Sequence, residues 1–376
     1  MIFHQPPLWL VVVAFVCALG PLVFFHELGH YLVGRLFGIP AETFSIGFGH
    51  ELVGWTDRRG TRWKIAWLPL GGYVKFVGDM SPASNPSELE HIPPELRSST
   101  FQLRPVWQRF LVVLAGPLAN FLLAIAIFAA FFTFVGTPQT NIVGGVIPNT
   151  AAARAGLHPG DRIIEVAGQG TPTFMDISNV VAIRPGETVP LKIQRSNRIE
   201  SISVTLGTDW MEQSPGEKVK RGLLGVVPTM QVMEPVPAWR AVPMAVDYTI
   251  GFTRSIVDGI GQIFRGRVSP KELGGPVKIA KIAGAAAELG PLAFVQLLAL
   301  LSINLGFINL LPVPMLDGGH LFFYVVEAVR RKAPSANALE WAFRGGLALI
   351  LALVLFVTFN DLGGHGLFKG LQRLIG

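Results

Sequence analysis

The chain has 376 residues, of which 50% are hydrophobic and only 15% are charged, and its formal net charge is +6. A soluble domain usually carries about 25% charged residues, so this composition argues against an ordinary soluble enzyme and favours a membrane protein. The positive charge is explained by Lys and Arg in cytoplasmic loops, and no basic run with interleaved aromatic residues suggests a nucleic-acid partner. The single cysteine, Cys17, excludes an internal disulfide and a cysteine-based metal site.

Four stretches are long and apolar enough to cross a bilayer, because about 20 helical residues span the hydrocarbon core. They lie near 7–30, 108–135, 291–311 and 343–360. No Lys or Arg precedes Arg35, and cleavage after the first stretch would threaten the motif that follows it. We therefore interpret residues 1–37 as a retained first transmembrane helix and not as a signal peptide.

A metal-binding motif lies at the end of this first apolar run. His26 and His30 are four residues apart, so on a helix they share one face and can grip zinc, with Glu27 as a candidate general base. Ionisable side chains are costly inside a bilayer and usually have a functional reason. The alternative is a helix end with two interfacial histidines paired to Glu27, and the apolar setting argues against it.

Residues 38–105 form a predicted β region and loop at the cytoplasmic membrane interface. Strand-like patterns occur at 44–49, 63–68 and 73–77, and 81–105 has the composition of an exposed connection. Gly47 and Gly49 suit a backbone edge that pairs with an extended substrate, since a missing side chain permits close approach. The alternative is that both are ordinary turn glycines.

After the second transmembrane helix, predicted at 106–136, residues 138–210 have the composition of a soluble insert. Short strands are expected at 142–146, 162–166, 189–193 and 202–206, with a short helix at 151–155. Residues 211–290 are predicted to form a linker and amphipathic helices that lie along the membrane surface.

The third transmembrane helix, predicted within 291–320, is interrupted by Asn304 and Asn309 and then broken by two prolines. Polar groups at this depth should face protein or water. Asp317 follows the break, so its carboxylate could be a third metal ligand at membrane depth, although an Asp-Gly turn that ends the span fits the spacing equally well. His320 is a competing ligand. Residues 321–342 are predicted to be a cytoplasmic loop, and 343–376 the fourth transmembrane helix and tail.

The distribution of Lys and Arg predicts the orientation. The connection between the first two spans contains residues such as Arg58 and Arg59, and the connection between the last two contains Arg330, Arg331 and Lys332. Both connections should face the cytoplasm. Both termini and the insert then lie on the periplasmic side, and the motif at His26 lies near the cytoplasmic side.

Several motifs together resemble the site-2 protease family of intramembrane metallopeptidases, in particular the bacterial regulator-of-sigma-E proteases. The matching segments cover nearly the whole chain: His26–His30, Ser45–Gly49, Gly71–Lys75, Gly116–Asn120, Asn309–Gly319 and Asn360–Asp361. The resemblance implies one zinc ion per chain, held by His26, His30 and Asp317, with Glu27 as the base. It also implies that Asn309 and Asn304 line the substrate channel.

Within the insert, Gly156–Ile163 resembles part of a PDZ domain. Better-known members of this protease group carry two tandem PDZ domains, whereas this chain has room for one. A PDZ groove could receive a peptide ligand by strand addition near 143–146. Alternatively, the domain acts only as a steric filter over the entrance.

The expected fold is a polytopic α-helical membrane protein with about four transmembrane helices, a membrane-associated β-sheet region and one inserted PDZ domain. The expected function is an intramembrane zinc metalloendopeptidase of the bacterial inner membrane. Its partners would be the lipid bilayer and single-pass substrates, such as anti-sigma factors after a first cut or remnant signal peptides. A catalytically silent scaffold is disfavoured by the intact H-E-x-x-H, and a metal transporter by the clustering of the polar ligands at one depth.

Overall fold

The computed structural model describes residues 6–78, 100–138, 141–214, 217–229, 233–269 and 274–363. Among these residues, four helical stretches are long and apolar enough to cross a membrane, which confirms the predicted number of spans. They are α1 (Leu8–Leu36), α3 (Val106–Phe134), α8 (Pro291–Leu310) and Asn337–Asp361 within α10 (Ala336–Gly363). Most of the predicted connection at 81–105 and most of the predicted C-terminal tail lie outside the described residues.

The chain divides into two compact units, which we describe separately. The first contains residues 1–127 and 278–356, and the second contains residues 128–277 and 357–376.

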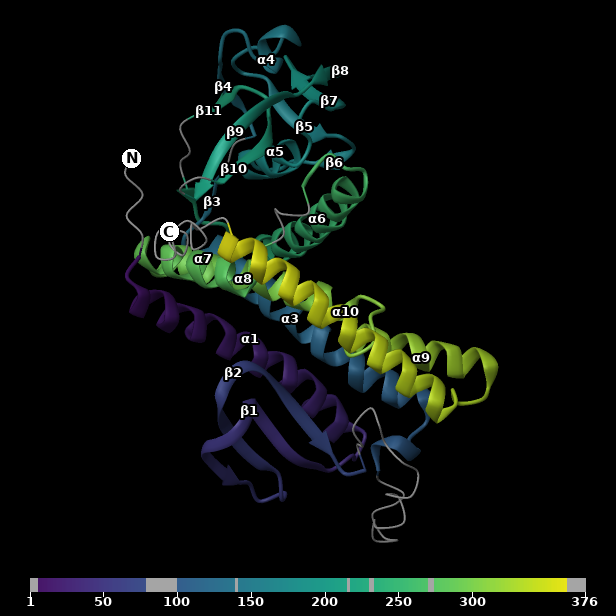
Figure 1. Cartoon of the computed structure of the whole chain (residues 1–376). Helices are drawn as coiled ribbons and strands as arrows, with labels where there is room; N and C mark the ends of the chain where they lie inside the picture. Colours follow the sequence, from purple (N-terminus) through teal and green to yellow (C-terminus); the bar gives the residue numbers. More distant parts are fainter. Residues whose placement is uncertain are drawn as a thin grey trace, which may run out of the picture. The chain divides into compact units, whose positions relative to one another are not determined.

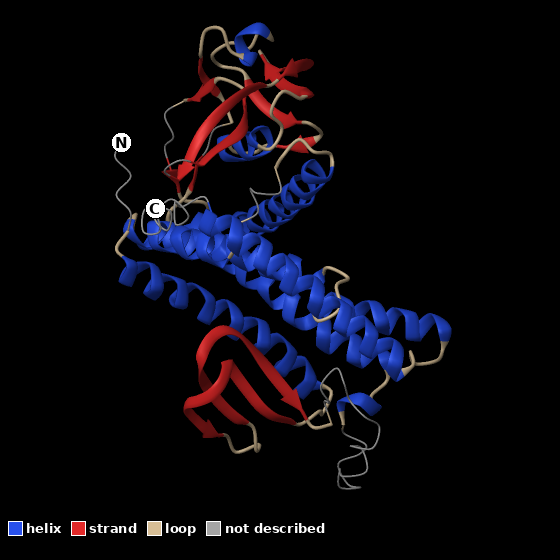
Figure 2. Cartoon of the chain, viewed as in Figure 1, coloured by secondary structure: helices blue, strands red, loops and turns tan. Residues whose placement is uncertain are grey.

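In the first unit, a long antiparallel hairpin packs against α1. Its strands are β1 (Ala41–Thr56) and β2 (Arg62–Phe76), and Figures 1 and 2 show it beside the C-terminal half of α1. Tyr31 from α1, Phe44 and Phe76 from the hairpin and Val112 from α3 are buried in one apolar cluster. Because these elements share one core, the hairpin is held firmly against the helix that carries the metal-binding motif.

The hairpin is more compact than the separate strands that the sequence predicts. Residues 43–46 of β1 pair on one side with 62–65 and on the other with 72–75. This part of β1 is therefore not a free edge. Gly47 and Gly49 follow it with φ angles of 91° and 86°, and a Cβ on Gly47 would lie 2.8 Å from the carbonyl oxygen of Ala66. Local backbone geometry therefore explains both glycines without any reference to substrate.

The remaining helices of the first unit revise the predicted boundaries. The expected loop at 321–342 is largely helical, because α9 covers Asp317–Arg330 and α10 begins at Ala336. Residues 321–329 are apolar at every position except Glu327, and this apolar run is typical of a helix or strand and not of an exposed loop. A left-handed residue, Arg331, with a φ of 52°, ends α9. Helix α7 (Pro276–Glu288) precedes α8.

The second unit contains the soluble insert, whose centre is a four-stranded antiparallel sheet in the order β6-β5-β7-β8. The apolar side chains of β7 alternate in burial, and Val189, Leu191 and Ile193 are buried in the core together with residues from the helices. The elements of the insert in chain order are β4 (Val143–Val146), α4 (Ala151–Arg154), β5 (Arg162–Val166), β6 (Gln169–Gly170), α5 (Phe174–Ala182), β7 (Thr188–Arg195) and β8 (Arg198–Thr205).

The insert continues beyond the predicted boundary at residue 210. The added strands are β9 (Gly207–Ser214), β10 (Glu217–Leu223) and β11 (Val226–Pro228). Strand β11 pairs with β4, and the backbone of Val143 also bonds to Gly160 and Asp161. Strand addition of a peptide, predicted near 143–146, is therefore blocked at Val143. Strands β3 (Thr137–Pro138) and β12 (Met233–Glu234) pair before α6 (Ala238–Phe264) begins.

Candidate metal centre

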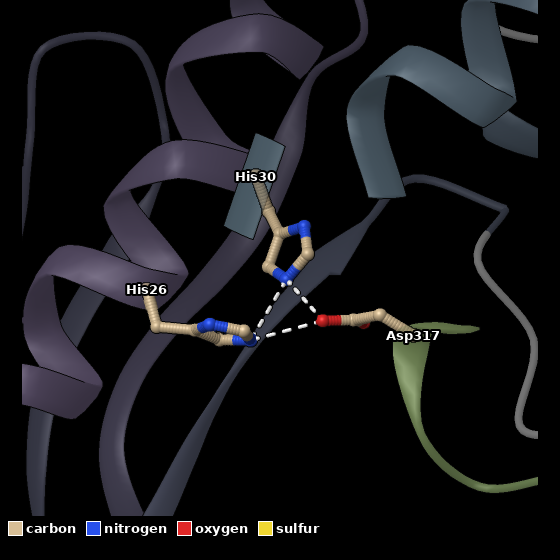
Figure 3. A group of neighbouring side chains, drawn as sticks. All are labelled: His26, His30 and Asp317. Carbon is tan, nitrogen blue, oxygen red and sulfur yellow. Dashed lines mark hydrogen bonds and ion pairs between the residues drawn. The ribbon is translucent and has the colours of Figure 1, made fainter. Parts of the chain in front are cut away.

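Helix α1 carries both histidines on one face. The Nε2 atoms of His26 and His30 lie 3.3 Å apart, and the two rings are nearly perpendicular, at 86°. Their convergence follows from the four-residue spacing, because residues i and i+4 stack on the same side of a helix. Figure 3 shows both rings directed toward the carboxylate of Asp317, which comes from another part of the chain.

Asp317 is the first residue of α9 and reaches the site by a tight reversal after α8. The reversal is stabilised by hydrogen bonds from the Leu316 N–H to the Val313 carbonyl and from the Gly319 N–H to the Leu316 carbonyl. A Cβ on Gly318 would lie 2.2 Å from the Leu311 carbonyl oxygen, so only glycine fits there. The sequence Asp-Gly-Gly thus allows the chain to fold back closely enough to present the carboxylate.

The three side chains meet at one point. Oδ2 of Asp317 lies 3.1 Å from Nε2 of His26 and 3.5 Å from Nε2 of His30. One potential ligand atom from each residue lies within 4.8 Å of the others, and no other group of this kind occurs among the residues that the structure describes. His320 is not part of the group, since its ring packs against Phe343 with 5.1 Å between centroids.

A backbone carbonyl fixes the orientation of the His30 ring. Its Nδ1 lies 2.9 Å from the carbonyl oxygen of Val112 in α3, and a carbonyl can only accept, so Nδ1 carries the hydrogen. The neutral ring then presents a bare lone pair at Nε2. The ring fits because Gly116 has no side chain, since a Cβ there would lie 2.2 Å from Nε2.

The His26 ring is held by a side chain. The amide Nδ2 of Asn120 in α3 lies 3.0 Å from Nδ1 of His26, and Asn120 is fully buried. The hydroxyl of Ser302 in α8 donates to the backbone carbonyl of Asn120 over 2.7 Å. Three helices therefore meet behind the two rings.

Glu27 lies next to this cluster, between α1 and β2. It is 8% exposed, and the backbone N–H of Val74 in β2 donates to its carboxylate. A Cβ on Gly72 would lie 3.0 Å from Cγ of Glu27 and 2.7 Å from the side chain of Val23. Glycine at position 72 therefore lets the strand approach the helix at the level of the glutamate.

The donor set suits a divalent metal, and zinc in particular. Two imidazole nitrogens and one carboxylate oxygen are a common ligand set of catalytic zinc, which leaves a further position open. Oδ2 of Asp317 is buried and makes no hydrogen bond of normal geometry to any described residue. A lone pair of His30 and a carboxylate oxygen directed at each other repel unless a cation lies between them. The three residues therefore fit a zinc ion.

The structure places the predicted substrate-binding residues less clearly. Asn304 donates its amide to the carbonyl of Leu300 in its own helix, over 3.0 Å, and Asn309 is half-buried in the last turn of α8. Among the described residues, neither has a recorded bond to the histidines or to Asp317. Their part in substrate binding stays a prediction.

Sequence reasoning assigned no role to Asn120. The signal was present, because an asparagine inside an apolar span needs a polar partner. It lies four residues after Gly116 and hence on the same face of α3. Which face of α3 meets the histidines was not readable from the sequence.

Comparison with known proteins decides the family. A family model described as peptidase family M50 matches residues 14–353. The chain belongs to peptidase family M50. This site-2 protease family is zinc-dependent, so the M50 chain is a zinc metalloprotease, and the four long apolar helices in the described part of the chain fit an inner-membrane location.

Bacterial relatives match this M50 peptidase over nearly its whole length. The protein named "Putative zinc metalloprotease Atu1380" from Agrobacterium fabrum is 43% identical and covers 93% of this chain and 95% of its own. "Putative zinc metalloprotease mll0638" from Mesorhizobium japonicum is 44% identical, with 94% and 98% covered. "Metalloprotease MmpA" from Caulobacter vibrioides is 36% identical, with 96% and 97% covered.

Proposed function

We propose that this M50 peptidase cleaves transmembrane segments of single-pass membrane proteins inside the bilayer. The observation that carries the proposal is the convergence of His26, His30 and Asp317 on one point, with two of them inside an apolar helix of 29 residues. Ionisable side chains within a transmembrane helix are costly and usually have a functional role. Here that role would be to bind and activate the water that peptide hydrolysis consumes. A site at this position acts on peptide bonds that soluble proteases cannot reach.

In this proposal His26, His30 and Asp317 hold the zinc ion, and Glu27 handles the protons. A zinc ion held by these residues would supply a water molecule of lowered pKa and a positive charge beside the scissile carbonyl. Glu27 takes a proton from the attacking water and passes it to the leaving amine. The Val74 N–H orients the Glu27 carboxylate, and the carbonyl of Val112 keeps the His30 lone pair directed into the site.

The substrate must lose its helical hydrogen bonds before it can be cut, because a helix hides its peptide bonds. We propose that the hairpin and the end of α8 hold the extended chain. In this proposal Gly47 and Gly49, which follow the doubly paired part of β1, let the substrate backbone approach, and Asn309 and Asn304 offer amides to the substrate main chain.

We propose that the insert is a single PDZ domain on the periplasmic side. Its core, its short helices and the segment Gly156–Ile163 support this assignment. Strand β4 pairs with β11 on one side, and Val143 bonds to Gly160 and Asp161, which leaves little of β4 for a peptide ligand, so we favour a role as a size filter that excludes bulky outer domains. Substrates would then be proteins shortened by an earlier cut, such as anti-sigma factors, or remnant signal peptides, in regulated intramembrane proteolysis.

The orientation that we propose follows from the loop charges: termini and insert in the periplasm, and the metal centre near the cytoplasmic side of the inner membrane. A cysteine-accessibility scan of the intact cell membrane tests it. A cysteine placed in the β1–β2 turn should be labelled only from the cytoplasm.

Cleavage itself is tested with the purified full chain, reconstituted with a single-pass model substrate. The cut should map inside the apolar segment by mass spectrometry. Glu27→Gln should abolish cleavage and keep about one zinc per chain, whereas His26→Ala should lose both. Cleavage only outside the apolar segment, or undiminished cleavage by Glu27→Gln, would refute the proposal.

A further inference from the structure

Asn120 lies against the ring nitrogen of His26 that points away from the metal centre. The distance between its amide Nδ2 and Nδ1 of His26 is 3.0 Å, and the residue is 0% exposed. Its own amide oxygen, Oδ1, is buried and has no hydrogen-bond partner among the described residues. A fully buried amide has a donor end and an acceptor end, and the end that faces the His26 ring needs a chemical reason.

The chemistry of a metal-bound histidine supplies that reason. If Nε2 of His26 binds a cation, its lone pair is occupied and the hydrogen of the neutral ring lies on Nδ1. That N–H is a donor and needs an acceptor. An amide NH₂ group has no acceptor to offer, whereas the amide oxygen of the same side chain does.

We propose that Asn120 is a positioning residue, whose carbonyl oxygen accepts the Nδ1 hydrogen of His26 and so keeps Nε2 free for zinc. A half-turn of the amide exchanges its nitrogen and oxygen in nearly the same space, so no movement of α3 is required. The inference rests on the proposed role of His26 as a ligand. It assigns to Asn120 the part that the backbone carbonyl of Val112 plays for His30, 2.9 Å from that ring.

The surroundings hold Asn120 in place. Ser302 donates to its backbone carbonyl over 2.7 Å and is itself buried, which ties α8 to α3 at this position. Asn120 is itself fully buried, so its side chain has little freedom to leave the ring even without this backbone hydrogen bond. A hydrogen bond of this kind fixes both the tilt of the imidazole and the nitrogen that faces the metal.

The test is zinc affinity, which is independent of proteolysis. Zinc is titrated into the chelator-stripped full-length protein against a chromophoric competitor, for wild type, Asn120→Leu and Asn120→Asp. Leucine has the size of asparagine but no acceptor, so Asn120→Leu should bind zinc about 10–100-fold more weakly. Aspartate can only accept, so Asn120→Asp should bind close to the wild-type affinity.

Two controls separate the acceptor from simple packing. Ser302→Ala removes the neighbouring buried hydrogen bond but leaves the amide, and should bind zinc as wild type does. The melting temperature of the zinc-free form shows whether each variant folds, and Asn120→Ala replaces Asn120→Leu if the latter does not. The comparison with Asn120→Asp then uses the alanine variant.

Each outcome has a clear meaning. Equal affinity for wild type and Asn120→Leu overturns the inference, as does equal weakening in Asn120→Leu and Asn120→Asp, because an acceptor would then not be what matters. Equal weakening in Ser302→Ala also overturns it. Tight zinc binding by a wild type that cleaves no transmembrane substrate would instead refute the proposed function and leave the role of Asn120 standing.

Discussion

Replacement of Gly116 by alanine tests whether the position of the His30 ring controls the site. The added Cβ would lie 2.2 Å from Nε2 and 2.4 Å from Cε1 of His30, whereas ordinary carbon contacts begin above 3 Å. The ring must therefore move by about 1 Å, and a displacement of that size at a catalytic group can cost about 100-fold in rate. Helix propensity acts in the opposite direction, because alanine is favoured over glycine by about 1 kcal/mol in a helix.

The assay measures kcat/KM on a single-pass substrate together with zinc per chain, for Gly116→Ala and for Gly20→Ala. Gly20 lies in α1, and a Cβ there would have no neighbour within 4 Å, so it is a matched control for the effect of alanine on a membrane helix. We expect Gly116→Ala to lose about 100-fold in kcat/KM and part of its zinc, and Gly20→Ala to behave as wild type. Wild-type zinc content and rate in Gly116→Ala would refute the reasoning.

Three further predictions concern zinc and stability, the pH dependence of the insert, and substrate selection. Zinc at 100 times its Kd should stabilise the fold by about 2.7 kcal/mol, so chelation should lower the Tm of the wild type but not of Asp317→Ala. Burial alone would raise the pKa of Asp161, but hydrogen bonds and charge from Arg195 and the N–H of His158 lower it. This contribution is present above pH about 4 and is lost as the pH falls below it, so the hydrogen-exchange protection factors of the insert should fall less on acidification in Asp161→Asn than in wild type. Replacement of 141–229 by a short linker, which the pairing of β3 with β12 permits, should allow cleavage of substrates with intact outer domains, and unchanged discrimination would contradict the filter role.

The metal centre was largely predictable because its signal is local. The spacing of His26 and His30 determines that they share a helix face, whatever the rest of the chain does. The number of spans was predictable for a similar reason, since length and apolarity alone decide whether a helix can cross a bilayer. Asp317 was different: its spacing fitted a turn equally well, and its assignment as a ligand came from the resemblance to a known family.

What the sequence could not provide is the set of contacts between segments far apart in the chain. The sequence predicts a strand at 44–49 but not its neighbours, and residues 43–46 pair on both sides because β2 bends around them. The insert boundary at 210 missed the return strand β11, whose partner β4 precedes it by some 80 residues. Such pairings depend on which surfaces meet in the folded protein, and alternation along a single strand carries no information about its neighbours.

The same limit explains why Asn120 could be placed in a family motif from the sequence but could not be given a role. A polar residue in an apolar span indicates that it has a polar partner, but the sequence does not identify that partner. Only the close contact of α1 and α3 at Gly29, where a Cβ would lie 2.3 Å from the carbonyl oxygen of Ala115, brings the His26 ring within reach of the amide. Glycines at the helix contact thus determine the geometry of the site, because they set the distance across which the ligands are held. Substitutions at Gly29 should therefore weaken zinc binding even though glycine itself offers no ligand, and zinc titration of Gly29→Ala beside Gly20→Ala would measure that effect.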